Sequence, residues 1–392
     1  MKIIRFGELY SIPTSNGVSR PSAVRGEGFH MINMGELFSF DVINEMPMER
    51  VFLSDKEQKT YLVKKGDLLF ARQSLVAAGA GKCSIVNNIL EPTTFESHLI
   101  RVRLDETRCC PRYYYYLFKL PDNPIKTIVN QCAQAGIRGS ELQKIKVPLP
   151  MLAEQRRIAS ILSTYDNLIE NNNKRIRLLE QMAENLYKEW FVRFRFPGHE
   201  KAEFENGLPK GWVYAKLEDI LSLKDSVRIP LSSLERSNMQ KKYPYYGAAS
   251  ILDYVDDYLF DGVYLLLGED GSVIDENGYP YIQYVWGRFW VNNHAHVIEK
   301  KGVYSVEFLY CLFKRMNIQS VVTGVAQPKI SQGRLFNKKV IKPCDSIISL
   351  FDKQIQPIFA GIRQLTEENN NLSRQRDLLL PRLMSGKLEV NV

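Results

Sequence analysis

Apolar residues recur at alternating steps of four and three along two segments of the chain. The first series runs Ile158, Leu162, Tyr165, Ile169, Ile176, Leu179, Ala183, Leu186, Trp190 if Asn172 fills one position. The second series runs Ile348, Phe351, Ile355, Ile358, Ile362, Leu365, Leu372, Leu379, Leu383, with Asn369 and Arg376 at its polar positions. A sustained heptad pattern needs a partner helix. The two segments are therefore predicted to be long helices that pair as an antiparallel coiled coil.

Each predicted helix contains three consecutive asparagines, at 171–173 and 369–371, although asparagine is a poor helix former. The heptads place Asn172 and Asn369 on the apolar seam and the other asparagines outside it. A polar seam residue lowers stability but selects one register. We expect Asn172 and Asn369 to meet near the centre of the pair, with solvated helix residues as the alternative. Pro357 is expected to kink or interrupt the second helix near its start.

The rest of the chain combines short apolar runs bounded by glycine, such as GDLLFAR and GVYLLLG, with one helical segment in each half. Tyr113–Tyr116 belong to the first of these helical segments and are expected in the core. Residues 132–150 match residues 325–343 at a constant offset, and SHLIRV at Ser97 matches AHVIEK at Ala295. The chain is thus predicted to be a tandem duplication of an α+β unit with a pseudo-two-fold axis. The expected domains are residues 1–150, a helical spacer at 151–197, a second unit at 198–344 and a helical spacer at 345–392.

Composition narrows the class of protein. The 392 residues are 45% hydrophobic and 24% charged, as in globular domains. The formal charge of +8 and the pI near 9.0 favour a polyanionic partner. Six cysteines without a C-x-x-C pair, no membrane-length apolar run and no signal-peptide core predict a reduced, cytoplasmic protein without a membrane partner.

Polar residues on loops beside the predicted strands are the candidates for contact with double-stranded DNA. They are Arg72, Gln73 and Ser74, then Gln134 and Arg138 in the first unit, and Gln327, Lys329 and Ser331 in the second. Arginine and glutamine make bidentate hydrogen bonds to guanine and adenine, whereas lysine more often holds phosphate. The alternative is that they are ordinary solvated loop residues.

Several segments of the chain resemble the DNA-specificity subunit of type I restriction–modification systems. They are Leu152-Ala-Glu-Gln-Arg-Arg-Ile158, Leu186–Phe191, Leu208-Pro-Lys-Gly-Trp212 and Leu380-Pro-Arg-Leu-Met-Ser-Gly386, together with Lys64–Arg72 and Tyr243–Gly262 in the units. The resemblance implies two target recognition domains that each read half of a split DNA sequence, with the helices setting the gap. The Leu-Pro-x-Gly-Trp opening is present only before the second unit.

The resemblance further implies a subunit with no catalytic activity and no cofactor of its own. Methyltransferase subunits would dock on it, and through them a restriction and translocase subunit. S-adenosylmethionine, ATP and Mg²⁺ are then expected on the partners. A non-DNA-reading coiled-coil adaptor and an unfamiliar nuclease or methyltransferase remain as alternatives.

The residues themselves offer no catalytic or metal motif. The nearest methyltransferase-like element, DNPI at Asp122, lacks its second proline and its aromatic residue. His294 and His296 have no further ligands at metal-like spacing, so a packed or DNA-facing pair is the expected role and no metal site is predicted.

Overall fold

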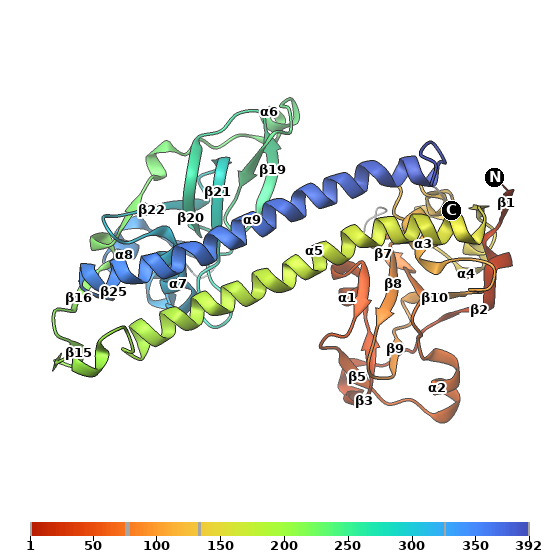
Figure 1. Cartoon of the computed structure of the whole chain (residues 1–392), viewed down its shortest axis with the longest axis horizontal. Helices are drawn as coiled ribbons and strands as arrows, with labels where there is room; N and C mark the ends of the chain where they lie inside the picture. The colour runs from red at the N-terminus through yellow and green to blue at the C-terminus, as the bar shows by residue number, and fades with distance from the viewer. Residues whose placement is uncertain (1, 75–78, 132–134, 325–326, 391–392) are drawn as a thin grey trace. The chain divides into compact units, whose positions relative to one another are not determined.

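The structure is a computed structural model that describes residues 2–74, 79–131, 135–324 and 327–390 (Figure 1). The chain forms two compact units, each of which contains one globular part and one end of each long helix. The first unit comprises Met1–Glu170 with Asn369–Val392, and the second comprises Asn171–Glu368. Among the described residues, no helix is long and apolar enough to cross a membrane.

Two helices much longer than the others confirm the heptad prediction. Helix α5 (Leu152–Tyr187) has 36 residues and continues into a π-helical turn at Lys188–Val192. Helix α9 (Asp345–Met384) has 40 residues and runs through Pro357 without a break, so the expected interruption there is wrong. Proline removes one helical N–H and crowds the preceding turn. Burial of the flanking Ile355 and Phe359 in the core holds the helix together across that defect.

The two helices run antiparallel within each unit. In the first unit Ile158 and Leu162 share a core with Leu380 and Leu383. In the second unit the rings of Tyr187 and Phe351 lie 6.2 Å apart. There a Cβ built on Gly361 would lie 3.3 Å from Leu179 Cδ1, so the backbone of α9 comes close to α5. The start of α5 thus opposes the end of α9 in the first unit, and the end of α5 opposes the start of α9 in the second, as the sequence predicts.

The globular part of the first unit is built on a five-stranded sheet of order β2-β10-β6-β8-β4. Its strands are β2 (Tyr10–Asn16), β4 (Val42–Asn44), β6 (Leu68–Ala71), β8 (Cys83–Asn88) and β10 (Leu99–Leu104). Around it lie β1 (Lys2–Arg5), β3 (Arg25–Ile32), β5 (Glu49–Val51), β7 (Gln73–Ser74), β9 (Thr93–Phe95), β11 (Asn130–Gln131), β12 (Ala135–Gly136) and β13 (Lys146–Leu149). The short helices are α1 (Met34–Ser39), α2 (Asp55–Tyr61), α3 (Pro111–Leu117) and α4 (Gly139–Leu142).

The second unit has a six-stranded sheet of order β17-β22-β20-β21-β18-β19. Its strands are β17 (Leu221–Leu223), β18 (Tyr243–Tyr246), β19 (Ile251–Val255), β20 (Phe260–Gly268), β21 (Ile282–Val291) and β22 (Ala295–Lys300). The remaining elements are β14 (Phe204–Glu205), β15 (Leu208–Pro209), β16 (Val213–Lys216), β23 (Val322–Thr323), β24 (Lys329–Ile330), β25 (Lys339–Lys342), α6 (Ser233–Ser237), α7 (Val306–Arg315) and α8 (Gln332–Phe336).

The two sheets share one topology, which confirms the duplication. The first five strands of each order correspond in sequence, and all their pairings are antiparallel except the last. That last pairing is parallel in both units, between β4 and β8 and between β18 and β21. In the first globular part the first strand, β1, pairs with the last, β13; in the second, β16, which follows the short hairpin of β14 and β15, pairs with the last strand, β25.

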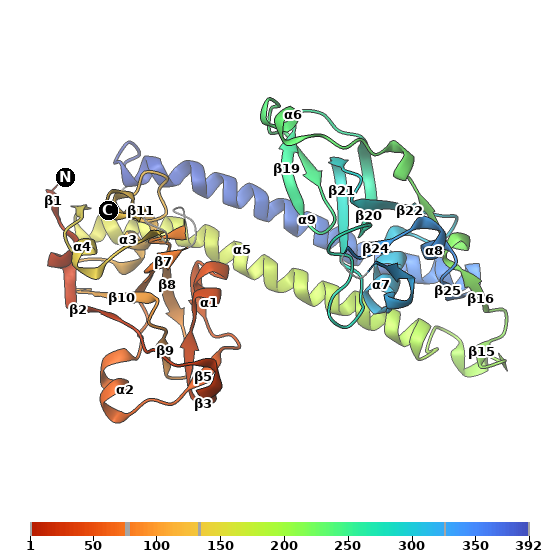
Figure 2. The same ribbon diagram turned by 180° about the vertical axis from the view of Figure 1, so that it is seen from behind.

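The core of each unit lies between its sheet and its helices. In the first unit α3 packs beside α5, and α7 occupies the matching position in the second (Figure 2). The four consecutive tyrosines of α3, Tyr113–Tyr116, are all buried, as expected from the amphipathic partner segment. Burial is possible on all faces because the sheet, α4 and the long helices surround this short helix.

Candidate nucleic-acid interface

The polar residues predicted in the first unit come together although some sixty residues separate them. Arg72, Gln73 and Ser74 directly follow β6, and Gln73–Ser74 form β7, which pairs with β12. Beyond β12 the N–H of Ile137 donates to the carbonyl of Arg72 at 3.0 Å. Arg138 follows and is exposed at the N-terminus of α4. Gln134 lies outside the described residues.

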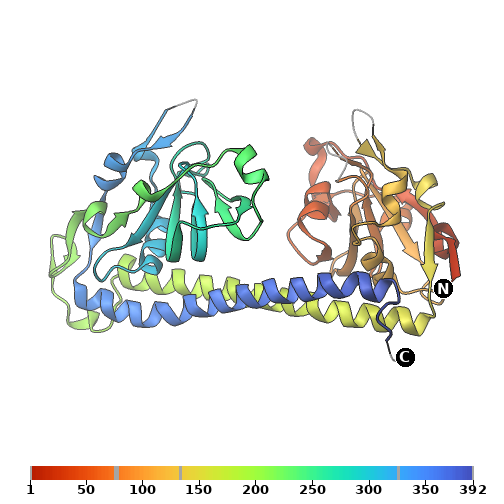
Figure 3. The same ribbon diagram turned by 90° about the horizontal axis from the view of Figure 1, so that it is seen from above.

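The predicted residues of the second unit lie on and after the hairpin of β23 and β24. Thr323 pairs with Lys329, and Gln327 is exposed between the two strands. Ser331 is the residue before α8 and is half-buried. The matching hairpin of the first unit pairs β11 with β12. In each unit the hairpin projects from the end of the globular part that is remote from the long helices (Figure 3). Such a projecting, polar end suits insertion into a DNA groove.

One histidine of each unit also belongs to this end: His98, which was not predicted as a contact residue, and His294, for which a packed or DNA-facing role is expected. His98 Nδ1 lies 3.0 Å from Gln73 Oε1, and His294 Nδ1 lies 2.5 Å from Asp270 Oδ1. The sequence match of SHLIRV with AHVIEK pairs His98 with His296, and that alignment is wrong by two residues. Strand pairing places Leu99 opposite Ala71 and Ala295 opposite Gly268, so the counterpart of His98 is His294.

His296 instead belongs to a buried polar cluster with Asp225, Glu269 and Arg228. His296 Nδ1 lies 2.5 Å from Asp225 Oδ2, and its Nε2 lies 2.8 Å from the carbonyl of Ile330. Burial raises the pKa of the Asp225 carboxyl, but hydrogen bonds from His296, a backbone N–H and Gln332 outweigh it and hold the pKa below its usual value. The cluster fixes the strand ends from which the half-buried Asp270 and the exposed His294 project.

Within the described part of the chain, two groups of side chains have the spacing of metal ligands. One is Asp225, Glu269 and His296, and the other is His30, Glu45 and Glu91. In the first group Arg228 Nη1 lies 2.7 Å from Glu269 Oε2, and in the second Arg50 Nη2 lies 2.8 Å from Glu91 Oε2. A guanidinium therefore already supplies positive charge to a carboxylate in each group.

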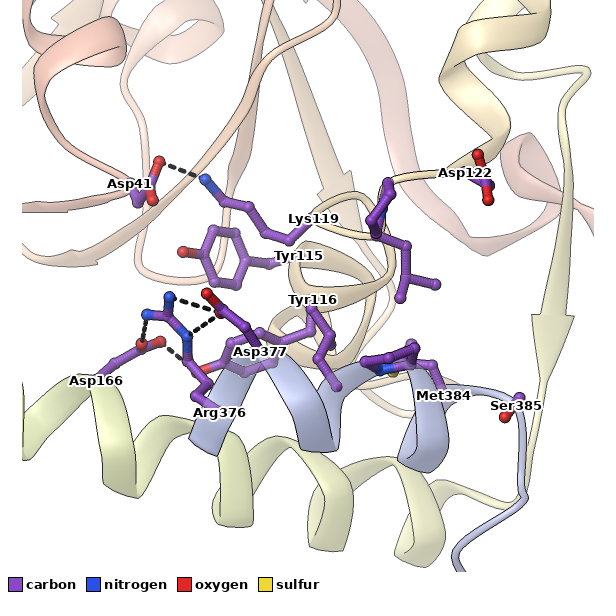
Figure 4. A pocket seen from close by; sticks show the side chains of 14 residues that line it. Asp41, Tyr115, Tyr116, Lys119, Asp122, Asp166, Arg376, Asp377, Met384 and Ser385 are labelled. Atoms are coloured by element: carbon purple, nitrogen blue, oxygen red, sulfur yellow. Dashed lines mark hydrogen bonds and ion pairs between the residues drawn. The ribbon is translucent and has the colours of Figure 1, made fainter. Parts of the chain in front are cut away.

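A pocket of about 640 Å³ opens in the first unit between α3 and the C-terminal end of α9 (Figure 4). Arg376 bridges Asp166 and Asp377 there, with Arg376 Nη1 at 2.7 Å from Asp166 Oδ1. Lys119 pairs with Asp41 on the other side. The lining holds four aspartates against one lysine and one arginine, so it does not attract phosphate. The hairpin end is therefore the better candidate for DNA.

The segment Leu152–Ile158 has an anchoring role that its sequence did not reveal. Gln155 is fully buried, its Oε1 accepts from the N–H of Cys110 at 2.9 Å, and its Nε2 donates to the carbonyl of Pro150. This side chain ties the start of α5 to the start of α3 and so fixes the direction in which the long helix leaves the globular part.

Comparison with known proteins places these features in one family. The model described as the type I restriction modification DNA specificity domain matches the chain twice, over residues 32–181 and 209–376. The type I restriction enzyme MjaIX specificity subunit of Methanocaldococcus jannaschii is 29% identical over 300 residues, covering 71% of this chain and 69% of that protein. The MjaVIII specificity subunit of the same organism is 23% identical over 305 residues, covering 71% of this chain and 70% of that protein.

A solved structure shows the same fold over nearly the whole length. The S subunit of a type I restriction–modification system from M. genitalium covers 97% of this chain and 95% of its own, with a TM-score of 0.59 and 16% sequence identity. At this identity the likeness concerns the fold.

Proposed function

We propose how the two units of this chain select DNA, starting from the fact that the chain belongs to the type I restriction modification DNA specificity family. The chain is the DNA-recognition subunit of a type I restriction–modification complex. The observation that carries the proposal is the duplication itself. The family model matches each half, and each half has the same order of its first five sheet strands and a projecting polar hairpin. Each unit reads one half of a bipartite sequence, and α5 and α9 set the gap between the halves.

Recognition in the first unit is assigned to the residues that β7 and β12 bring together. Arg72 and Gln73 provide hydrogen-bond donors for base edges, and the exposed Arg138 lies within the same polar end. Ser74, and Gln134 where the chain continues toward β12, complete the proposed contact set of this unit. In the second unit Gln327 reads bases, while Lys329 and Ser331 hold phosphate.

The chain itself carries out no chemical step in this proposal. Methyltransferase subunits dock on it, and a restriction and translocase subunit joins through them. S-adenosylmethionine, ATP and Mg²⁺ are bound by those partners. The net charge of +8 favours association with DNA in the cytoplasm.

The test is methylation mapped at base resolution in cells that express the chain with its methyltransferase subunits. A split motif that appears only with this chain is the expected result. If the chain were an adaptor that does not read DNA, the methylated motif would not depend on this chain. If the chain were itself an enzyme, the purified chain without partners would turn over S-adenosylmethionine or cleave DNA.

Two variants test the assigned residues in the same assay. Arg72→Ala and Arg138→Ala should each lower discrimination between specific and random DNA by about 1–3 kcal/mol, because a bidentate base contact is lost. Arg108→Ala is the matched control, since Arg108 is exposed in the same unit and its guanidinium donates to a backbone carbonyl, that of Glu8. Equal weakening of specific and random DNA would assign Arg72 and Arg138 to phosphate instead.

A further inference from the structure

The residue that follows the central strand occupies the same backbone position in both units. The N–H of Arg72 donates to the carbonyl of His98, and the N–H of Glu269 donates to the carbonyl of His294, both at 2.8 Å. The carbonyls of Arg72 and Glu269 in turn accept from the N–H of Ile137 and Ile330. Ile137 and Ile330 are matched positions of the repeat. Gln73 and Asp270 are therefore equivalent, as are His98 and His294.

The histidine holds the equivalent side chain in the same way in both units. His98 Nδ1 contacts Gln73 Oε1, and His294 Nδ1 contacts Asp270 Oδ1. These oxygens are acceptors, so Nδ1 carries the hydrogen in both contacts. The other terminal atom is Nε2, a donor, in Gln73 but Oδ2, an acceptor, in Asp270. One scaffold thus presents opposite hydrogen-bonding polarity in the two units.

The neighbouring side chains reinforce this difference. Arg72 adds further donors beside Gln73. Glu269 is turned inward, with Arg228 at 2.7 Å and Lys329 Nζ at 3.5 Å, and its side chain is only 15% exposed. Asp270 is more exposed, at 34%, and forms an isolated bridge with Lys329 at the base of the hairpin. Asp270 is accordingly the acidic group of this pair that faces outward.

We propose that Gln73 and Asp270 are equivalent base-reading positions of opposite polarity, an inference that rests on the proposed function. The donors of Gln73 and Arg72 select the base that offers two acceptors and no donor on its major-groove edge, which is guanine. The carboxylate of Asp270 selects a base with an exocyclic amino group there, cytosine or adenine, and repels the carbonyl oxygens of guanine and thymine. The two half-sites therefore carry different bases at the corresponding position, guanine in one and cytosine or adenine in the other.

Reciprocal variants test the assignment. Asp270→Asn turns the acceptor into the amide of the first unit, and Gln73→Glu introduces the carboxylate of the second. Glu276→Gln is the control, because Glu276 is exposed on the loop just after Asp270 and loses the same charge. Each variant is expressed as the full chain with its methyltransferase subunits, and methylated motifs are mapped at base resolution. Complex formation and the thermal unfolding midpoint are measured in parallel.

We expect Asp270→Asn to raise methylation at least about tenfold at sites with guanine or thymine at one position of one half-site. Gln73→Glu should change one position of the other half-site, and Glu276→Gln should change neither. Unchanged motifs, or uniform loss of methylation from an intact complex, would overturn the inference. If the unaltered chain directs no motif at all, the proposed function itself fails, which is a separate outcome.

Discussion

Replacing Arg363 by methionine is expected to detach α9 locally from the globular part of the second unit. Glu307 of α7 is 4% exposed, and its carboxylate accepts from Tyr284 Oη at 2.7 Å, Gln356 Nε2 at 2.7 Å and Arg363 Nη1 at 3.2 Å. Gln356 and Arg363 lie on α9. The carboxylate thus depends on α9 for its only formal positive charge among the described ion pairs.

The magnitude follows from what remains after the change. Removing one partner of a buried ion pair costs about 3–5 kcal/mol, because the other charge stays buried without compensation. Two neutral donors still hold Glu307, and the Arg363 side chain is 23% exposed, so the lower end applies. We expect Arg363→Met to lower the free energy of local unfolding by about 3 kcal/mol. Methionine retains the aliphatic stem, which limits the loss of packing.

A double-mutant cycle provides the control. Glu307→Gln removes the charge but keeps an oxygen for Tyr284, so it should cost about 1 kcal/mol. Once Glu307 is neutral, Arg363→Met should cost much less than it does alone. Hydrogen exchange of the α7 amides in low urea measures each variant within the full chain. Additive effects of the two changes, or a change below about 0.5 kcal/mol for Arg363→Met, would refute the account of Glu307 as a buried charge held by α9.

Three further outcomes are expected. Gln155→Leu leaves the N–H of Cys110 and the carbonyl of Pro150 without the partner that Gln155 provides, so it should lower the free energy of unfolding in urea by about 2–4 kcal/mol. A change near zero would contradict the anchoring role of Gln155. The heptads predict that Asn172 and Asn369 select the register, so Asn172→Leu with Asn369→Leu should raise Tm and blur the gap between half-sites; an unchanged gap would leave the register to the apolar residues. Hydrogen bonds hold the pKa of Asp225 low, so its stabilising contribution is present above about pH 4 and is lost as the pH falls through the folded-state pKa. Asp225→Asn should therefore flatten the loss of stability between pH 5 and 3 in urea melts, and an unchanged slope would contradict this.

The long helices and the duplication were predictable because their signals are local and repeated. Heptad spacing locates both helices, and Asn172, at 3% exposure, is the buried member of its triplet. The constant offset between the two halves carries β13 onto β25 and the start of α5 onto the start of α9. Periodicity and repeat length need no knowledge of distant contacts, which is why they suffice for the architecture.

The proposed recognition surface was only partly predictable because it depends on pairing between distant strands. Arg72 and Arg138 were predicted separately, and only the pairing of β7 with β12 brings their loops together. His98 was aligned with His296 because the short segments around them have similar residues. The strand register, which no local sequence pattern reveals, instead matches His98 with His294. Asp270 was missed for the same reason, since its equivalence to Gln73 is a property of the backbone hydrogen bonds.

The pairing of β1 with β13 and of β16 with β25 has an evolutionary consequence. Because Lys2 lies opposite Leu149, and Val213 opposite Lys342, the polypeptide from β1 to β13 and that from β16 to β25 each begin and end at one place. The intervening polypeptide is a segment, here called a cassette, whose first and last strands lie side by side. Recombination between genes at the two flanking segments can therefore exchange a whole cassette while the helical segments stay unchanged. A lineage with such a chain can acquire a new DNA preference in a single genetic event, without passing through partly altered intermediates.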